Sequence, residues 1–235
     1  MTQQQALVAL HERGYAIVGR MQPNEFAAMS DFLSQRLVYV DAHVPETARM
    51  RGDALRTRMH PTECFCVPTA DAVVAPHLLE TALSLTDVAA AYLARDPPVM
   101  YSANAFWTRP GPEAVRADIQ AYHRDTDDEH FLAMFVYLTD VLDDAGGPQD
   151  LEGPDGMVRT IFGPAGTVFL ADTSRLHRGR KPTKGERGIA WVRWGISERP
   201  AANAWDKIEP IAASALGDRY PADPRLRKSI ELLVR

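Results

Sequence analysis

Short apolar segments alternate with glycine- and proline-containing turns over residues 99–194, and this pattern restricts the possible folds more than any other feature of the chain. The segments are residues 99–108, 131–139, 157–162, 167–171 and 187–194. Their lengths and their content of β-branched and aromatic residues are typical of strands, and Gly163-Pro164-Ala165-Gly166 predicts a turn between two of them. Several short strands joined by such turns indicate a β-sandwich or a small barrel.

Apolar residues at helical spacing lie on both sides of this strand-rich region. We predict helices at residues 2–13, at a segment that begins with Pro23, and at residues 76–95. Shorter helices are predicted at residues 211–216 and 224–233. The expected fold is therefore mostly β with flanking helices (α+β), around a double-stranded β-helix (jelly-roll, cupin-like) core. We expect a single domain over residues 1–235, with a helical part at about 1–98, the jelly-roll core at about 99–197 and a C-terminal helical extension at about 198–235.

The composition limits the possible partners and locations. With 46% hydrophobic and 24% charged residues, a chain of 235 residues can form one compact core. The net charge of −5 argues against binding to nucleic acid or to a membrane surface, since both need a basic face. No signal peptide and no bilayer-spanning segment is expected. Cys64 and Cys66 are too close for an unstrained disulfide, so we predict reduced thiols and a cytoplasmic protein.

A group of metal-binding residue types lies inside the strand-rich region. His123 and Asp125 are separated by one residue, and His177 follows much later in the chain. Two histidines and one carboxylate in this order are the ligand set of a 2-His-1-carboxylate site, which holds one face of Fe(II) and leaves positions open for a cosubstrate and O₂. On a strand, His123 and Asp125 would share a face because side chains alternate. His130 is a rival ligand, but it follows an acidic run and is expected to be exposed.

At these residues the chain resembles the phytanoyl-CoA dioxygenase-like branch of the Fe(II)/2-oxoglutarate oxygenases. The resemblance covers about residues 100–196, with a weaker match at the N-terminus. It implies that His123, Asp125 and His177 bind iron, and that 2-oxoglutarate and O₂ are cosubstrates. It also implies that Arg187, ten residues after His177, pairs with the distal carboxylate of 2-oxoglutarate. Members of the family often have Pro-Gly-Ser-His between the ligands, where this chain has Gly146-Gly147-Pro148-Gln149.

Two arginines on one predicted strand compete for the cosubstrate. Arg187 and Arg193 share a face with Ile189 and Trp191, and either guanidinium could bind a carboxylate at two points. The spacing in the family favours Arg187, while Arg193 could instead bind substrate or form a structural ion pair. Further candidates for cosubstrate contacts are Asn104, Tyr137 and Thr167, with Tyr101 as a weaker one. Trp191 is a candidate substrate contact.

The same resemblance indicates the type of reaction. Related halogenases have Ala or Gly at the position of Asp125, so the aspartate favours a hydroxylase over a halogenase. The expected function is hydroxylation of an unactivated C–H bond in a small molecule, with succinate and CO₂ as coproducts. Arg51 and Arg56, in an arginine-rich segment, could hold an anionic substrate. The alternative is a cupin-type jelly-roll binding protein without oxygenase activity. A zinc hydrolase is a third possibility, but it would not explain Arg187.

Overall fold

The computed structural model describes residues 1–39, 49–51, 64–110, 120–198 and 210–235, with only the backbone described at 49–51. The helices are α1 (Gln3–Arg13), α2 (Pro23–Ser34), α4 (Thr69–Val73), α5 (Leu78–Ser84), α6 (Thr86–Leu93) and α7 (Pro224–Ser229). The strands are β1 (Tyr15–Arg20), β2 (Leu37–Tyr39), β3 (Arg49–Arg51), β4 (Cys64–Val67), β5 (Val99–Thr108), β6 (Phe131–Tyr137), β7 (Gln149–Glu152), β8 (Val158–Ile161), β9 (Thr167–Ala171), β10 (His177–Gly179) and β11 (Arg187–Gly195). Short 3₁₀ helices lie at Asp144–Gly146, Ala213–Ala215 and Gly217–Arg219.

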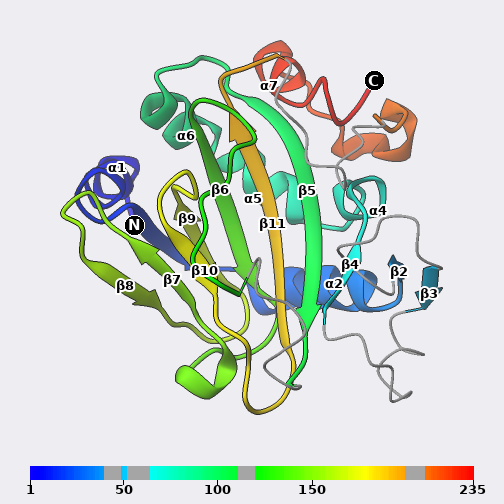
Figure 1. Cartoon of the computed structure of the whole chain (residues 1–235). Coiled ribbons are helices and arrows are strands. Elements are labelled where there is room, and N and C mark those ends of the chain that lie inside the picture. Colours follow the sequence, from blue (N-terminus) through cyan, green and yellow to red (C-terminus); the bar gives the residue numbers. More distant parts are fainter. Residues whose placement is uncertain (40–48, 52–63, 111–119, 199–209) are drawn as a thin grey trace.

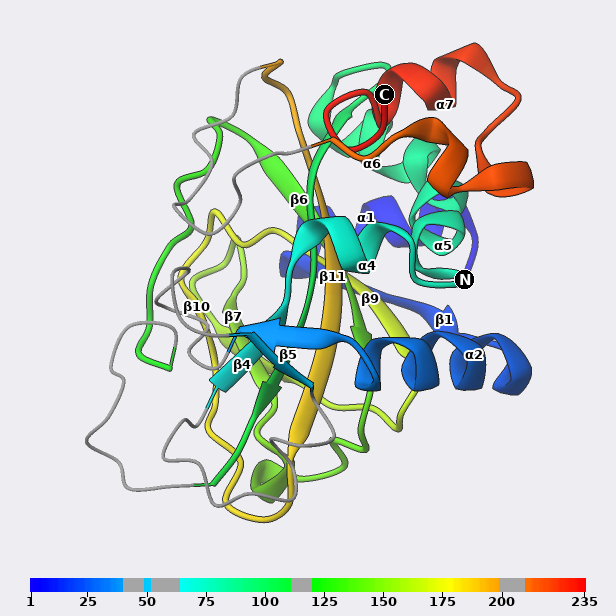
Figure 2. The ribbon, with the colours of Figure 1, turned by 90° about the vertical axis from the view of Figure 1, so that its right-hand side faces the viewer.

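The described strands form two antiparallel sheets. The larger sheet has the order β1-β9-β6-β11-β5-β4-β2-β3, and the smaller sheet has the order β10-β7-β8. Figure 2 shows the larger sheet nearly edge-on, with helices α1, α2, α5 and α6 on one side and strands β7 and β10 on the other. The expected jelly-roll fold, mostly β with flanking helices, is therefore confirmed.

Two apolar cores follow from the period-2 alternation of the central strands. On β6, Leu132, Met134 and Val136 pack in the core beneath the helices, while Ala133, Phe135 and Tyr137 pack between the two sheets. Since both faces of β6 are buried, its sequence is a continuous apolar run rather than an alternating one. Strands β5 and β11 lie beside β6 in the larger sheet (Figure 1), and they also contribute side chains to the core between the sheets.

The ends of the first two helices explain why they were predictable. Thr2 and Gln5 form a reciprocal capping box at the start of α1, and Gly14 ends it in the left-handed conformation, with φ of 78°. Pro23 occupies the first turn of α2, where its missing N–H costs nothing.

One helix and one strand differ from the prediction. The expected helix at residues 76–95 is wrong, because two helices, α5 and α6, meet at Leu85. The hydroxyls of Thr81 and Ser84 donate to the carbonyls of His77 and Thr81, and such bonds compete with the helical backbone pattern. The expected strand for His123 and Asp125 is also wrong, since the segment is a loop in which only His123 forms an isolated bridge.

The N-terminal part contributes more than helices, because β1, β2, β3 and β4 all join the larger sheet. Strand β1 forms one edge of that sheet by pairing with β9. Within the described residues, no helix is long and apolar enough to cross a membrane.

Candidate metal centre and cosubstrate site

The two histidines are brought together by the backbone. His123 and His177 form an isolated antiparallel bridge in which each N–H donates to the carbonyl of the other residue at 2.9 Å. Residues that face each other across such a bridge direct their side chains to the same side. The Asp125 N–H donates to the Thr173 carbonyl at 3.0 Å, which fixes the loop beside the segment that leads into β10. The loop therefore replaces the predicted strand and still gathers the three side chains.

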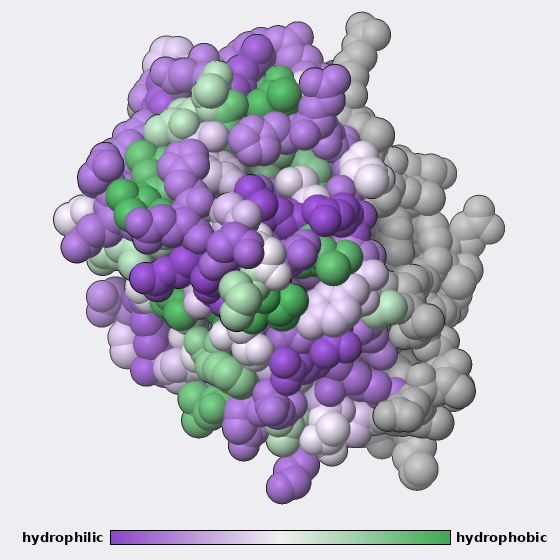
Figure 3. All heavy atoms as spheres, turned by 60° about the vertical axis from the view of Figure 1, so that its left-hand side comes forward, coloured by the Kyte–Doolittle hydropathy of each residue, from purple (hydrophilic) through white to green (hydrophobic). Residues whose placement is uncertain are grey.

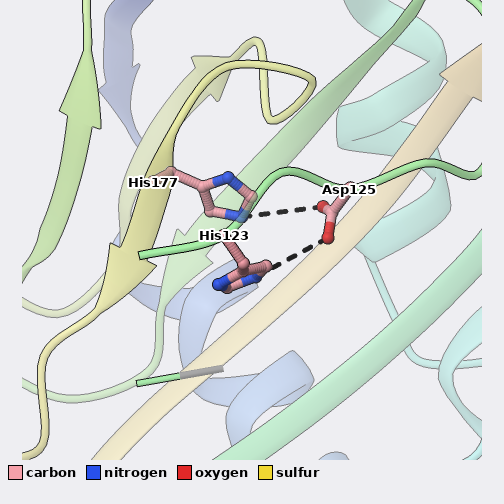
Figure 4. Close-up of side chains that lie close together, drawn as sticks. All are labelled: His123, Asp125 and His177. Carbon is pink, nitrogen blue, oxygen red and sulfur yellow. Dashed lines mark ion pairs between the residues drawn. The ribbon is translucent and has the colours of Figure 1, made fainter. Parts of the chain in front are cut away.

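Hydrogen bonds orient both imidazole rings. Nδ1 of His123 donates to the Ala121 carbonyl, and Nδ1 of His177 donates to the Arg175 carbonyl, both at 2.9 Å. Because a carbonyl only accepts, the proton of each neutral ring lies on Nδ1 and the lone pair lies on Nε2. Each Nε2 lies 3.7 Å from a different oxygen of Asp125, as the dashed lines of Figure 4 show. The lone pairs and the carboxylate thus converge on one point.

The surroundings shift the pKa values of His177 and Asp125 towards the protonation states that bind a metal. Burial lowers the pKa of His177, which favours the neutral ring. Burial alone would raise the pKa of Asp125, but the attraction of the Arg193 guanidinium is the largest of several opposing effects, and the pKa is lowered. The ligand atoms of the three residues lie within 4.8 Å of one another. Two neutral nitrogens and one anionic oxygen suit Fe(II) and similar divalent ions.

A cavity of about 320 Å³ opens beside this cluster and between the two sheets. One part of its wall is aromatic, with Phe106 and Trp191 stacked at 4.3 Å between ring centroids and Phe135 next to Trp191. Another part is polar and includes Thr108, Gln149 and Arg187. The cluster of His123, Asp125 and His177 therefore faces a cavity that has an apolar side and a cationic end.

Arg187 is the cation at that end, and it has only neutral partners. Its side chain is 4% exposed. Nη1 donates to the carbonyls of Gly147 and Arg180 at 2.9 and 3.1 Å, and Nη2 donates to the Thr108 hydroxyl at 3.2 Å. Nε has no partner, and no carboxylate among the described residues pairs with the guanidinium. Burial lowers the pKa of Arg187, which is the expected effect on a cation without a counter-charge.

Arg193, six residues further along β11, has the opposite environment. Nη2 donates to Oδ2 of Asp125 at 2.9 Å, and Nη1 makes a short contact with Oδ2 of Asp127. Asp127 is 1% exposed and also accepts from the Tyr101 hydroxyl at 3.2 Å. Arg193 also lines the cavity, but both of its terminal nitrogens already contact carboxylates.

The other predicted site residues fall into three groups. Asn104, predicted to contact the cosubstrate, and Trp191, predicted to contact the substrate, both line the cavity. Tyr137 and Thr167 are buried outside its described lining, and the Tyr137 hydroxyl donates to the Ile161 carbonyl at 2.7 Å. Arg56 lies outside the described residues, and only the backbone of Arg51 is described. The ligand roles and contacts assigned to all these residues stay predictions.

Several residues of the site escaped the sequence analysis. Asp127 belongs to the acidic run before His130 and was not singled out, although it is the second partner of Arg193. Thr108 accepts a hydrogen bond from Arg187, and Gln149 and Cys66 line the cavity. The alternation of β5, which places Asn104, Phe106 and Thr108 on one face, was the available signal for Thr108. The rival ligand His130 is not in the cluster, since its ring packs 5.3 Å from that of Tyr92.

Comparison with known proteins supports the fold. No protein-family model and no curated protein matches the sequence. Among solved structures, HygX from Streptomyces hygroscopicus with nickel and 2-oxoglutarate bound is 13% identical, with a TM-score of 0.57 over 84% of this chain and 88% of that chain. The non-haem α-ketoglutarate-dependent epimerase SnoN from nogalamycin biosynthesis is 14% identical, with a TM-score of 0.58 over 88% and 89%. The carbocyclase SnoK from the same biosynthesis is 15% identical, with a TM-score of 0.57 over 83% and 86%. At these identities the likeness establishes the shared fold.

Proposed function

We propose that this chain is a non-haem Fe(II)- and 2-oxoglutarate-dependent oxygenase. One observation carries the proposal: a buried arginine that has no carboxylate partner among the described residues lies in the same cavity as a 2-His-1-carboxylate cluster. An unpaired buried charge is costly, so a fold that keeps one has a reason to keep it. An anionic cosubstrate that also chelates the metal supplies the missing counter-charge.

The metal would be held by Nε2 of His123, Nε2 of His177 and one carboxylate oxygen of Asp125. The backbone bridge and the two Nδ1 hydrogen bonds orient the rings before any metal arrives. When bound, Fe(II) together with 2-oxoglutarate and O₂ supplies an oxidant for C–H bonds and yields succinate and CO₂. The protein's own task is to hold these groups, orient the C–H bond and exclude water.

Arg187 would bind the distal carboxylate of 2-oxoglutarate through one edge of its guanidinium. An arginine has five N–H donors, and three of those of Arg187 are used by Gly147, Arg180 and Thr108. The two that remain are Nε–H and one Nη2–H, which lie side by side and match the two oxygens of a carboxylate. Gly179 supports this arrangement, because a Cβ at that position would lie 2.6 Å from Nη1.

The substrate would be a small molecule whose reacting C–H bond lies against the aromatic part of the wall. Phe106, Phe135 and Trp191 offer an apolar surface near the metal cluster. A carboxylate at position 125 favours hydroxylation over halogenation, because no ligand position is freed for halide. Proteins of the same fold include an epimerase and a carbocyclase, so the product must be identified to distinguish hydroxylation from other oxidations.

The test is a titration of Fe(II) and then 2-oxoglutarate into the protein without oxygen. We expect one Fe(II) per chain and a metal-to-ligand absorption band that develops only with 2-oxoglutarate. Admission of O₂ should then release succinate and CO₂, and a screen of small molecules should find compounds that stimulate this release. A protein that binds the metal but neither develops the band nor consumes 2-oxoglutarate would instead be a metal-binding jelly roll.

A further inference from the structure

Asp125 is held from behind by a buried ion-pair cluster that the metal site does not itself require. The cluster consists of Arg193 on β11, Asp127 on the ligand loop and Tyr101 on β5. The side chain of Arg193 is 11% exposed and that of Asp127 is 1% exposed. Strands β5 and β11 pair from Arg187 and Thr108 to Gly195 and Val99, with a register shift just after Arg193, so Arg193 and Tyr101 lie on neighbouring strands of the larger sheet.

The cluster acts on one oxygen of Asp125. Oδ1 lies 3.7 Å from Nε2 of His123 and Oδ2 lies 3.7 Å from Nε2 of His177, so the histidines do not distinguish the two oxygens. Arg193 does, because its Nη2 donates to Oδ2 at 2.9 Å. A charge-assisted hydrogen bond draws electron density from the oxygen that accepts it. Oδ1 is therefore the stronger donor of the two towards a metal ion.

We propose that Arg193 is a positioning residue that, anchored by Asp127, makes Asp125 a ligand through a single oxygen. The inference rests on the proposed function. A carboxylate can bind a metal through one oxygen or through both, and the second mode occupies one more coordination position. A 2-His-1-carboxylate site depends on open positions, and a chelating cosubstrate takes two of them. By occupying Oδ2, Arg193 keeps a position free for the cosubstrate or O₂.

Asp127 has a separate part in this arrangement. Without it, Arg193 would be a second buried cation near the metal, and it would weaken metal binding by repulsion and attract the cosubstrate carboxylate away from Arg187. With Asp127 present, Arg193 and Asp127 together add no net charge beside the metal. Arg193 therefore orients Asp125 without opposing a divalent cation.

The decisive variant is the charge-matched double substitution Arg193→Gln with Asp127→Asn. It removes the hydrogen bond to Oδ2 without changing the net charge and leaves no buried carboxylate at position 127. We expect the Fe(II) affinity, measured by competition with a chelator, to be unchanged or higher because Oδ2 becomes available to the metal. The 2-oxoglutarate affinity, measured from the absorption band without oxygen, should fall about tenfold or more, the usual size of effects around a metal ligand.

Two further variants and a control complete the experiment. Asp127→Asn alone leaves an uncompensated cation and should lower the Fe(II) affinity by about tenfold. Arg193→Lys keeps the charge and should recover part of the 2-oxoglutarate affinity. Arg225→Gln is the matched control, since Arg225 also bridges two carboxylates, Asp87 and Asp96, but on the surface. It should leave both affinities unchanged.

A lower affinity for 2-oxoglutarate without a lower affinity for Fe(II) distinguishes loss of positioning from general damage to the site. If the double variant loses Fe(II) and 2-oxoglutarate together, or keeps both at the level of the unmodified protein, the inference is wrong. If the unmodified protein never develops the band, the proposed function and this inference both fail. A normal band in the unmodified protein, with no effect of the variants, refutes only the role of Arg193.

Discussion

Replacing Arg187 by alanine removes the buried cation on which the cosubstrate site depends. Two N–H groups, Nε–H and one Nη2–H, are free to bind a carboxylate. Hydrogen bonds to a charged group contribute about 1.5–3 kcal/mol each. Loss of one partner of a buried, hydrogen-bonded charge pair costs about 2–5 kcal/mol. At 1.4 kcal/mol per tenfold, the 2-oxoglutarate affinity of Arg187→Ala should fall by roughly 30-fold to several thousandfold.

The assay is a titration of 2-oxoglutarate into the Fe(II)-loaded protein without oxygen, followed by its metal-to-ligand absorption band. Fe(II) affinity should change little, because Arg187 does not contact His123, Asp125 or His177. Arg187→Lys should recover part of the loss, since lysine keeps the charge but not the two-point fork. The unfolding temperature must be measured alongside, because alanine leaves the Gly147 and Arg180 carbonyls without this donor.

The variant Arg193→Ala tests whether Arg187 or Arg193 binds the distal carboxylate of 2-oxoglutarate. If Arg193→Ala abolishes the band while Arg187→Ala binds 2-oxoglutarate normally, the spacing from His177 and the free guanidinium edge have both been misread. If neither variant matters, the oxygenase proposal itself fails.

Other substitutions test the remaining parts of the site. His123→Ala and His177→Ala should each abolish Fe(II) binding and 2-oxoglutarate consumption while the far-ultraviolet circular dichroism stays unchanged, and full activity in either would contradict the ligand assignment. Asp125→Gly should lose oxidation because the anionic ligand is gone, and a chlorinated product from the unmodified protein would show that the aspartate does not decide the reaction type. Asp150→Asn should lower the free energy of unfolding by at least about 1.5 kcal/mol, because the buried carboxylate accepts hydrogen bonds from Arg178, Arg180 and Tyr122. Two of these donors, Tyr122 and Arg178, are the neighbours in sequence of His123 and His177. Hydrogen bonds from Arg180, Thr160 and Arg178 outweigh burial and lower the pKa of Asp150, so this stability is present above the unfolded-state pKa of about 3.9 and is lost as the pH falls through the folded-state pKa. Acid unfolding curves of the variant should therefore be flatter than those of the unmodified protein.

The strands that the sequence predicted well are those whose identity depends on local pattern. The bounds of β5 and β9 agree with the prediction, and β11 extends it by one residue, because long apolar runs end at clear turns. Strands β2, β3, β4, β7 and β10 are three or four residues long. Such segments carry too few residues for an alternation, and they become strands only because a partner lies beside them.

The residue types and order of His123, Asp125 and His177 led us to expect that these side chains cluster, whereas the backbone that brings them together was not predictable. His123 reaches His177 through one isolated bridge, a contact between residues far apart in the chain. The exposure of individual apolar side chains on the surface was likewise not predictable from the sequence. Figure 3 shows hydrophobic and hydrophilic residues interspersed on one face of the molecule. Leu142, Met157 and Val158 are among the exposed apolar residues, and no local pattern predicts their exposure.

The difference between the two arginines of β11 also depends on distant residues. Arg187 and Arg193 share a face and, at about 3.3 Å per residue, lie about 20 Å apart along the strand. Arg193 obtains its counter-charges from Asp125 and Asp127, on a loop 68 and 66 residues earlier in the chain. No property of β11 alone distinguishes the cation that is free from the one that is paired.

The charges of the assembled site lead to an expectation for the substrate. Asp125, Arg187 and Arg193 line the cavity and Asp127 pairs with Arg193, and these four buried or nearly buried charges of the described residues sum to zero. Fe(II) adds two positive charges and 2-oxoglutarate two negative ones, so the loaded site is again neutral. A charged substrate group beside the metal would be buried without a counter-charge, at a high cost in free energy.

We therefore expect the reacting part of the substrate to be uncharged and to lie against Phe106 and Trp191. Any charge on the substrate should lie towards the rim, where Arg124 is 56% exposed. Among pairs of compounds that differ only by a carboxylate next to the reacting carbon, the neutral member should stimulate succinate release more strongly, and the opposite preference would show that Arg193 is available to substrate after all.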